Sequence, residues 1–572
     1  MFFLAAFCGF LNSLSANPTT TGALILDSTF ECISVTATFS GDSSANNSAS
    51  VEWRKAGQTA WNPAYNPFID RRQTILGASN THVNEARTSI VGLTPGTAYE
   101  VRVTWTDPDG VTGTNPVTGN VTTQVTTPFL GQRILWVDGS LSAAGDGSST
   151  TPYNSLAAAV SAAQPGDTIK IKPGAYPPLS ISKSGNASAW IKLEGQAGGP
   201  VTVGGGINSI TTDGNYLWFQ GLTIPVSTTH GFLLGTANYV MIDNCLFPNI
   251  SSANVYGNAG VSITANASHV WIRNCTFNTL NTSTGSDGAG NVFAIYFRSK
   301  NRGGGHVISD CVINGPFRDG IGGEGNAAGD GPVYNSDICR NLVCNVRDDA
   351  IECEGENRLV RIWGNILTNH TGQSIIGVAG TDLGPLYVFR NQMFSTNGVC
   401  AFKHGNNSPG PAYFFHNTIV TQGTGTADGF SDIGGSSYSE LHVYMNNIVQ
   451  TDRYGIYRGG RSNRYDYNLW NPKTWMVDEW NGAGSYQTLA QFKSATGQEA
   501  HGIQGSPAFT SNTRDISDTS PAVDKGLLIP NFNDPTSAWP FANTGPDLGH
   551  HETGSTAATK PSPPQGVRVI PQ

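Results

Sequence analysis

Short apolar runs that alternate with polar residues fill most of the chain, and few segments keep a helical period. In the first hundred residues, Cys32–Phe39 (CISVTATF) and Ser50–Arg54 (SVEWR) have this alternation and are separated by turn residues. A period of two is typical of strands that bury one face. We therefore predict a β-sandwich over residues 17–127, joined by a linker to a second domain that begins at residue 131.

One segment interrupts the β pattern near the start of the second domain. Residues 155–163 (SLAAAVSAA) predict a short helix, with Asn154 or Ser155 as its N-cap. The helix must end before Pro165, because proline and the glycine after it do not continue a helix. A strand is expected to follow at Thr168–Ile171.

A repeated signature predicts a solenoid over residues 131–552. Asn or Asp followed by apolar or Cys residues recurs at intervals of 21 to 36 residues, starting at Asn244, Asn274, Asp310, Asn341, Asn365, Asn391, Asn417, Asn447 and Asn468. An Asn repeated at one turn can bond the backbone of its own and the next coil and so form a ladder. Cys245, Cys275 and Cys311 share one register and are expected to stack inside. We therefore predict an all-β chain dominated by a parallel β-helix.

Two stretches carry resemblances to known folds. LTPGTAYEVRVTW (residues 93–105) resembles fibronectin type III modules, in which Tyr99 would be the corner tyrosine that bonds back to the backbone. Residues 136–176 resemble the opening of secreted right-handed parallel β-helices of the pectate lyase-like and polygalacturonase-like superfamily, where a helix caps the first coil. The resemblance implies a secreted or cell-surface protein. The fibronectin-like module would then serve self-association or attachment to a cell surface.

Composition and the chain ends narrow the class further. Residues 1–16 contain a short apolar run followed by small residues and are interpreted as a signal-like leader, and residues 553–572 as a Pro-rich tail. The formal charge is −9 and no basic stripe is present, which argues against nucleic acid as a partner. No other apolar run approaches the ~20 residues of a membrane span. The nine cysteines lack zinc-type CxxC pairs and predict no disulfide framework.

Residues 345–356 (NVRDDAIECEGE) concentrate five carboxylates in a chain that is only 13% charged. Ile351 and Cys353 are expected to face the core, so that Ala350, Glu352 and Glu354 face outward. Alignment of Ile321 with Ile351 places Asp319 beside Asp349 and Glu324 beside Glu354. The two coils would then present a groove lined by Asp319, Glu324, Asp348, Asp349, Glu352 and Glu354.

Neighbouring coils are predicted to add other groups to this groove. Tyr296 and Arg298 belong to the coil before the acids, and Gln373 to the coil after them. Lys403 and His404 belong to the next coil, where Lys403 faces outward if Phe402 faces the core. We expect Tyr296, Arg298, Glu324, Gln373 and His404 to contact a polysaccharide.

The acids also resemble a known pattern of catalysis. Polygalacturonase-type glycoside hydrolases carry an Asp on one coil, an Asp-Asp pair on the next and an Arg-x-Lys further on, which match Asp319, Asp348-Asp349 and Lys403. The resemblance implies that one Asp protonates the leaving oxygen, that the others activate water, and that Lys403 binds the substrate. The histidine of the family falls on Gln373 and its arginine on Ala401, so the match is partial.

Three alternatives to hydrolysis stay open. Glu352 and Glu354 are hard oxygen ligands that suit Ca²⁺, which favours a calcium-dependent polysaccharide lyase with Lys403, Arg358 or Arg361 as its base. A non-catalytic adhesin or tail-spike-like structural protein would instead bind glycan on exposed aromatic residues, for which the candidates are Trp470, Trp475 and Trp480. The acids would otherwise be a solvated face. Hydrolysis is preferred over elimination because the aspartate pattern matches more closely.

Overall fold

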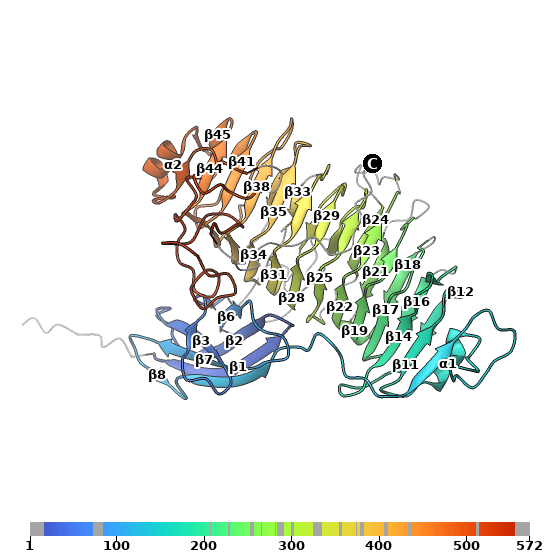
Figure 1. Ribbon diagram of the computed structural model, residues 1–572. Coiled ribbons are helices and arrows are strands. Elements are labelled where there is room, and N and C mark those ends of the chain that lie inside the picture. The colour runs from blue at the N-terminus through green and yellow to red at the C-terminus, as the bar shows by residue number, and fades with distance from the viewer. Residues whose placement is uncertain are drawn as a thin grey trace, which may run out of the picture.

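The computed structural model describes a sandwich and a long solenoid that lie side by side (Figure 1). The described residues are 17–554 apart from 73–83, 206–207, 227–228, 252–256, 265, 281, 283–290, 299–302, 324–333, 354–356, 373, 378–382, 405–409, 433–437 and 511–513. The leader over residues 1–16 and most of the Pro-rich tail therefore lie outside the described residues. None of the helices in this part of the chain has the length and apolar character that crossing a membrane requires.

The N-terminal part consists of two packed sheets. One sheet has the order β5-β6-β2-β1-β8 and the other β4-β3-β7-β9. Their bounds are β1 (Thr19–Ser28), β2 (Ile33–Ser40), β3 (Ser48–Lys55), β4 (Asn62–Pro63), β5 (Phe68–Asp70), β6 (Glu85–Ile90), β7 (Ala98–Thr106), β8 (Val111–Thr112) and β9 (Val117–Thr122). The buried hydroxyl of Tyr99 accepts a hydrogen bond from the backbone N–H of Thr94 at 2.9 Å, a bond of the kind expected of a corner tyrosine. The likeness to fibronectin type III modules stays a prediction.

The rest of the chain coils through three long sheets, which confirms the predicted parallel β-helix. The first sheet consists of β10 (Ile134–Val137), β11 (Thr168–Ile171), β14 (Ile191–Gly195), β17 (Leu217–Gln220), β19 (Asn238–Asp243), β22 (Ser268–Arg273), β25 (Val307–Ser309), β28 (Tyr334–Cys339), β31 (Arg358–Trp363), β34 (Leu386–Phe389), β37 (Ala412–Phe415), β40 (His442–Met445) and β43 (Arg464–Asp466).

The second sheet consists of β13 (Leu179–Ile181), β16 (Asn208–Thr212), β18 (His230–Leu234), β21 (Asn258–Thr264), β24 (Val292–Arg298), β27 (Ile321–Gly323), β30 (Ile351–Glu352), β33 (Ser374–Gly377), β36 (Cys400–His404), β39 (Phe430–Asp432), β42 (Tyr454–Tyr457), β45 (Trp475–Trp480) and β46 (Gly484–Tyr486). All its pairs are parallel except the last, between β45 and β46. It is the sheet that carries the acidic segment.

The third sheet consists of β20 (Leu246–Phe247), β23 (Thr276–Asn278), β26 (Val312–Asn314), β29 (Leu342–Cys344), β32 (Ile366–Thr368), β35 (Gln392–Ser395), β38 (Thr418–Thr421), β41 (Ile448–Thr451), β44 (Leu469–Pro472) and β47 (Ile503–Gln504). A short pair, β12 (Gly174–Tyr176) with β15 (Val201–Val203), precedes it. Apolar residues of all three sheets face inward and form one continuous core along the solenoid. Within the second sheet, Ile295, Ile321, Ile351, Ile376 and Phe402 stack coil upon coil in this core.

Two short helices lie at the ends of the solenoid (Figure 1). Helix α1 (Leu156–Ala162) follows Ser155, whose hydroxyl accepts a bond from the N–H of Ala158 at 3.3 Å. Its side chains Leu156, Ala159 and Val160 join the core beside the first strands. Helix α2 (Leu489–Thr496) begins with a capping box of Thr488 and Gln491 near the other end.

A buried ladder of amides runs along one corner of the solenoid. At each step the backbone N–H and the side-chain amide of one asparagine both donate to the amide oxygen of the next, at 2.9–3.1 Å, through Asn341, Asn365, Asn391, Asn417, Asn447 and Asn468. The predicted ladder is therefore present. Cys245, Cys275 and Cys311 stack in the core, as expected, and the eight described cysteines are free thiols.

The register of the early repeats differs from the prediction by one position. The N–H of Cys311 donates to the amide oxygen of Asn341 at 3.0 Å, so the cysteine, and not Asp310, precedes Asn341 in the ladder. Asp310 takes the turn position before it with a φ of 56°, as Arg340 does in the next coil. Aspartate and asparagine accept this left-handed backbone better than most residues, which explains why the signature begins one residue before the ladder in those coils.

The ladder ends on a buried carboxyl group. We therefore predict that the stability of the fold depends on pH. The side-chain amide of Asn468 donates to Glu499 at 2.6 Å, and burial raises the pKa of Glu499 from its ordinary 4.5 to about 8. The folded protein thus holds a proton that the unfolded chain loses near pH 4.5. The protonated carboxyl of Glu499 makes its full contribution to the folding stability below pH 4.5. This contribution is lost as the pH rises through 8.

We expect the Glu499→Gln variant to lose less thermal stability than the wild type between pH 6 and pH 9. A glutamine is neutral throughout and its amide oxygen can accept the bonds from Asn468. Melting temperatures over this range test the prediction, with Glu479→Gln as a control because the side chain of Glu479 is half exposed. Parallel curves for the wild type and Glu499→Gln would contradict it.

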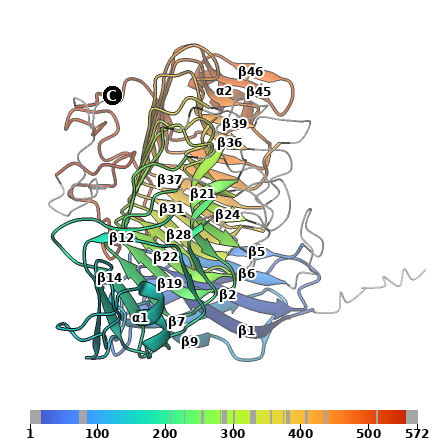
Figure 2. The ribbon, with the colours of Figure 1, turned by 90° about the vertical axis from the view of Figure 1, so that its right-hand side faces the viewer.

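The sandwich packs along the outer face of the first solenoid sheet (Figures 1 and 2). Cys32 and Val91 of the sandwich join an apolar cluster with residues of that sheet: Leu359, Trp363, Tyr387, Phe389, Tyr413 and Phe415. Ile529 and Phe532 from the C-terminal part of the chain complete the cluster. Asn531 exchanges two hydrogen bonds with the backbone of Val91, at 2.7 and 3.0 Å. Self-association or surface attachment through the sandwich stays a prediction.

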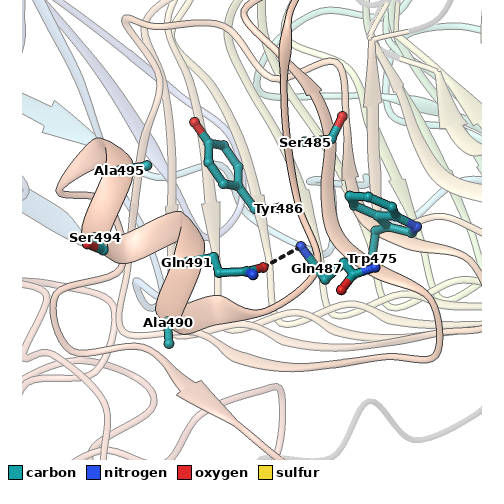
Figure 3. A pocket seen from close by; sticks show the side chains of 8 residues that line it. All are labelled: Trp475, Ser485, Tyr486, Gln487, Ala490, Gln491, Ser494 and Ala495. Atoms are coloured by element: carbon teal, nitrogen blue, oxygen red, sulfur yellow. Dashed lines mark hydrogen bonds between the residues drawn. The ribbon is translucent and has the colours of Figure 1, made fainter.

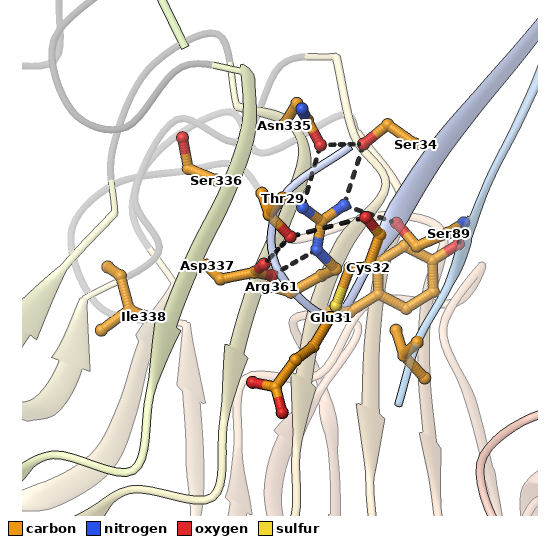
Figure 4. A network of polar contacts seen from close by, with 12 residues as sticks. Thr29, Glu31, Cys32, Ser34, Ser89, Asn335, Ser336, Asp337, Ile338 and Arg361 are labelled. Atoms are coloured by element: carbon orange, nitrogen blue, oxygen red, sulfur yellow. Dashed lines mark hydrogen bonds and ion pairs between the residues drawn. The ribbon is translucent and has the colours of Figure 1, made fainter. Parts of the chain in front are cut away.

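A buried guanidinium lies at the centre of this contact (Figure 4). Arg361 of β31 is inaccessible to solvent and its Nε donates to Asp337 of the same sheet at 2.5 Å. Its Nη1 donates to the hydroxyls of Ser34 and Ser89 in the sandwich, at 2.8 and 3.2 Å. A buried charge needs all of these partners, so the sandwich supplies part of the environment that the solenoid requires. Arg361 is therefore a structural residue, which removes it as the base considered for elimination.

Candidate active site

Three aspartates meet where two neighbouring coils enter the second sheet. Ile321 of β27 pairs with Ile351 of β30, and Asp319 and Asp349 lie two residues before them. The backbone N–H of Asp349 donates to Asp319 at 3.1 Å, so the carboxylate of one coil is fixed to the backbone of the next. This is the neighbourhood that the alignment of the two isoleucines predicts, whereas the chemical roles of the residues stay predictions.

The carboxylate oxygens of this cluster are close together. One oxygen from each of Asp319, Asp348 and Asp349 lies within 4.8 Å of the other two. Asp319 and Asp349 are fully buried, and the half-buried Asp348 lies 3.7 Å from the guanidinium of Arg318. Among the carboxylate, imidazole and thiol side chains of the described residues, these three aspartates are the group whose spacing suits a metal ion.

The cluster is strained electrostatically. Burial raises the pKa of Asp319 well above its usual range, and repulsion from the carboxylates of Asp348 and Asp349 raises it further. A hydrogen bond between the side chains of Asp319 and Glu352 acts in the opposite direction. Three carboxylates at this spacing cannot all be ionised without positive charge beside them. The cluster therefore favours either a bound proton or a bound cation.

A lysine from two coils further on completes the cluster. The ammonium of Lys403 donates to Oδ2 of Asp349 at 2.6 Å, and the hydroxyl of Ser374 donates to the other oxygen of the same carboxylate. Gly377 lies between Lys403 and Glu352 in the outward row of the sheet. A Cβ on Gly377 would lie 2.5 Å from the carboxylate of Asp349 and 3.4 Å from the lysine stem. The missing side chain therefore leaves the path along which Lys403 reaches the aspartate.

Gly322 leaves space in the same way on the other side of the cluster. A Cβ on Gly322 would lie 3.0 Å from the Cβ of Asp319 and 3.1 Å from that of Glu352. The absence of a side chain lets Glu352 lean back toward Asp319. The acids, the lysine and the two glycines thus form one arrangement that spans four coils, from β27 to β36.

Several residues predicted for the site lie elsewhere. Ala350 is part of the core, because the chain bends at 350–351 and turns two successive residues inward, so the prediction that it faces outward is wrong. His404 is buried, accepts from or donates to the hydroxyl of Tyr444 at 3.0 Å and packs on Phe414, so it does not line the groove. Glu324, Glu354 and Gln373 lie outside the described residues.

The coil before the acids contributes a buried aromatic pair beside the site. Tyr296 pairs with Gly322 in the outward row, and its ring stacks on Phe293 at 4.3 Å in a small buried cluster with Ala259. Arg298 is exposed at the end of β24. Ile351 and Cys353 are in the core, as expected. Of the predicted metal pair, Glu352 lies beside the cluster, while the closest set of ligands is made of the aspartates.

Sequence reasoning missed a related acid two coils beyond Ser374. Asp428 precedes Phe430 of β39 by two residues, the position that Asp319 and Asp349 hold in their coils. It is buried and pairs with the guanidinium of Arg453, whose Nε donates to it at 2.7 Å. The shared pattern of Asp, a small residue and an apolar residue (DGI, DAI, DGF) was the signal that could have found it.

Comparison with known proteins gives a match over part of the chain. Residues 135–322 match the family described as "Pel9A-like, right handed beta helix region". This segment contains Asp319 and ends before Asp348, Asp349 and Lys403. No curated protein matches the chain.

Solved structures that are similar to this chain include two lyases and an epimerase. Pectate lyase Pel9A is 14% identical, with a TM-score of 0.44 over 74% of this chain and 97% of its own. A rhamnogalacturonan lyase is 14% identical, with a TM-score of 0.33 over 56% and 82%. The periplasmic alginate epimerase AlgG is 11% identical, with a TM-score of 0.28 over 55% and 73%.

Proposed function

We propose that this protein cleaves an acidic polysaccharide by β-elimination in the groove over β27, β30, β33 and β36. The observation that carries the proposal is a set of three carboxylates with oxygens within 4.8 Å of one another, joined to an amine that lies 2.6 Å from one of them. The Pel9A-like region at residues 135–322 supports a polysaccharide as the substrate class. Such a substrate suits a secreted or cell-surface protein.

The spacing of the carboxylates favours elimination over the hydrolysis that the aspartate pattern suggests. Inverting glycosidases hold their two carboxyl groups ~6.5–9.5 Å apart to admit a water, and retaining ones hold them ~5–5.5 Å apart on either side of the scissile bond. Here oxygens of all three aspartates lie within 4.8 Å, side by side on neighbouring coils. Three carboxylates grouped this closely suit joint binding of one positive charge.

The donor set fits a divalent cation such as Ca²⁺. Hard carboxylate oxygens are the ligands that Ca²⁺ prefers, and Asp319, Asp348 and Asp349 would hold it, with Glu352 beside them. Burial, and then repulsion from Asp348 and Asp349, raises the pKa of Asp319, so a cation beside the cluster would favour ionisation of all three carboxyl groups. When bound, the cation would attract the carboxylate of a uronate residue, acidify the proton next to that carboxylate and favour the neutral form of a nearby amine.

Lys403 is the group placed to act as the base. Its nitrogen, held by Asp349, would take the proton from the ring carbon next to the uronate carboxylate. The electron pair of that bond forms a double bond to the adjacent ring carbon. The bond from this second carbon to the glycosidic oxygen breaks, and the leaving oxygen takes a proton from water. No water is added across the bond, so one new chain end is unsaturated.

The test is a screen of polygalacturonate, alginate and a rhamnogalacturonan backbone. Reducing ends and ultraviolet absorbance are measured on the same samples, with added Ca²⁺ or with chelator. We expect one unsaturated end for each new reducing end, loss of both with chelator, and recovery when Ca²⁺ is restored.

Each other outcome overturns the proposal. Reducing ends without unsaturated product would indicate a hydrolase, which is the alternative that the aspartate pattern favours. Binding of glycan without cleavage across the panel would indicate an adhesin or structural solenoid. Unsaturated product that persists at full rate in chelator would remove the cation from the reaction.

A further inference from the structure

The groove face leads to a pocket at the far end of the solenoid. The pocket has a volume of about 680 Å³ and lies between β45, β46 and helix α2 (Figure 3). Its lining residues are Trp475, Ser485, Tyr486, Gln487, Ala490, Gln491, Ser494 and Ala495. Trp475 and Tyr486 are half-buried and contribute ring surfaces, while the serines and glutamines contribute hydroxyl and amide groups. None of these eight residues is charged.

Trp475 belongs to the face that carries the proposed active site. Outward residues of successive strands pair in one row: Lys403 with Ser431, Ser431 with Tyr457, and Tyr457 with Asp478. On the parallel row nearer the strand starts, Tyr454 pairs with Trp475. Three strand spacings of ~4.8 Å separate β36 from β45, so the pocket begins roughly 14 Å from the coil of Lys403. A disaccharide does not bridge that distance, whereas a longer oligosaccharide does.

The surface between the two sites suits a sugar chain. The guanidinium of Arg453 lies 4.5 Å from the ring of Tyr454 and 5.3 Å from that of Tyr457, and it pairs with the buried Asp428. The two rings stack on each other at 5.8 Å. Arg453 and Asp428 neutralise each other, so the surface around them is aromatic and polar, and the carboxylate of Asp478 accepts a hydrogen bond from Ser485 at the pocket at 2.7 Å. Such surfaces bind the apolar faces and hydroxyls of sugars.

We propose that the pocket of Trp475 and Tyr486 is a distal subsite that binds one sugar ring of the polysaccharide held next to Lys403. The inference rests on the proposed function and adds that the enzyme acts on long chains. The ring is recognised by its face and its hydroxyls and not by a carboxylate, because the lining offers no cation. The contribution of Trp475 to binding is therefore insensitive to salt.

Binding to oligosaccharides of graded length tests the subsite without relying on cleavage. The background is Lys403→Met, in which the expected loss of the base slows turnover. The probes are fragments of two to eight sugars from polygalacturonate, alginate and the rhamnogalacturonan backbone, measured by calorimetry with Ca²⁺. We expect Trp475→Ala to raise Kd roughly tenfold for the longest fragments of the series that binds best, by loss of ring stacking, and to leave the shortest unchanged. The increase should be equal at low and high salt.

Two further variants serve as controls. Trp475→Phe retains a ring and should restore most of the affinity, which separates stacking from misfolding. Trp61→Ala removes a half-buried tryptophan that lies between Arg54 and Arg102 on the sandwich, and should change nothing. Equal affinity of Trp475→Ala and Trp61→Ala for long fragments overturns the subsite, as does an effect of Trp475→Ala that is independent of length, or no binding to any series. Length-dependent binding in this background, together with no cleavage by the protein that retains Lys403, supports the subsite while refuting elimination.

Discussion

Replacing Lys403 with methionine should reduce formation of unsaturated product by roughly 10²–10⁴-fold, the usual effect of losing a general base. Methionine keeps the length of the stem and the packing beside Gly377, but it cannot accept a proton. Binding of Ca²⁺ should survive, because the three aspartates are intact. Initial rates by ultraviolet absorbance at saturating Ca²⁺ measure the loss, and calorimetry with Ca²⁺ alone measures the retained affinity.

Chemical rescue distinguishes two roles of Lys403, that of the base and that of a counter-ion for Asp349. In Lys403→Ala, added small alkylamines should restore part of the rate, and rescue should increase with amine basicity once each amine is corrected for its protonated fraction. Lys473→Met is the matched control, since that side chain is largely exposed and pairs with Asp452. Wild-type rates in Lys403→Met, or rescue by inorganic cations equal to rescue by amines, would show that the lysine does not act as the base.

Replacing Asp319 with asparagine should weaken Ca²⁺ binding without destabilising the fold. In chelator, the variant should be at least as stable as the wild type, because it lacks a carboxylate whose ionised form burial and two neighbouring carboxylates disfavour. Its amide oxygen can still accept the bond from the backbone of Asp349. With Ca²⁺ at 100 times its Kd, the wild type should gain about 2.7 kcal/mol of stability. The variant should gain far less and lose activity.

Thermal unfolding with and without Ca²⁺ measures both effects in one experiment. Asp452→Asn removes a half-buried carboxylate that pairs with Lys473 at 2.6 Å, and it should keep the full response to Ca²⁺. An unchanged response in Asp319→Asn would exclude this residue as a ligand. A variant that is less stable than the wild type in chelator would show that Asp319 serves the fold instead.

The β-helix could be predicted from the sequence because its signals are local and repeated. The spacing of Asn341, Asn365 and Asn391 follows the coil length, and each of these amides donates to the next one along the ladder. The neighbourhood of Asp319 and Asp349 followed from one alignment, Ile321 on Ile351, because stacked apolar residues fix the register of parallel strands.

Strand alternation failed where the chain bends or where a side chain is missing. Ala350 and Ile351 both face inward at a corner, so counting by two placed Ala350 on the wrong side. The reach of Lys403 to Asp349 depends on Gly377, whose importance lies in the atoms that it lacks. The effect of Gly377 involves residues 26 or more positions apart and becomes visible only when the coils are stacked.

The buried contact of Arg361 has a consequence for how the protein is made. Its hydroxyl partners Ser34 and Ser89 leave the ribosome 327 and 272 residues before it does. The last residues of the same contact, Ile529 and Phe532, are made after Arg361. The sandwich can fold early, since domains fold from the N-terminus during translation, but its docking face stays bare until the residues that cover it have been made. A nascent chain therefore holds an open apolar patch until the solenoid and residues 529–532 have been made.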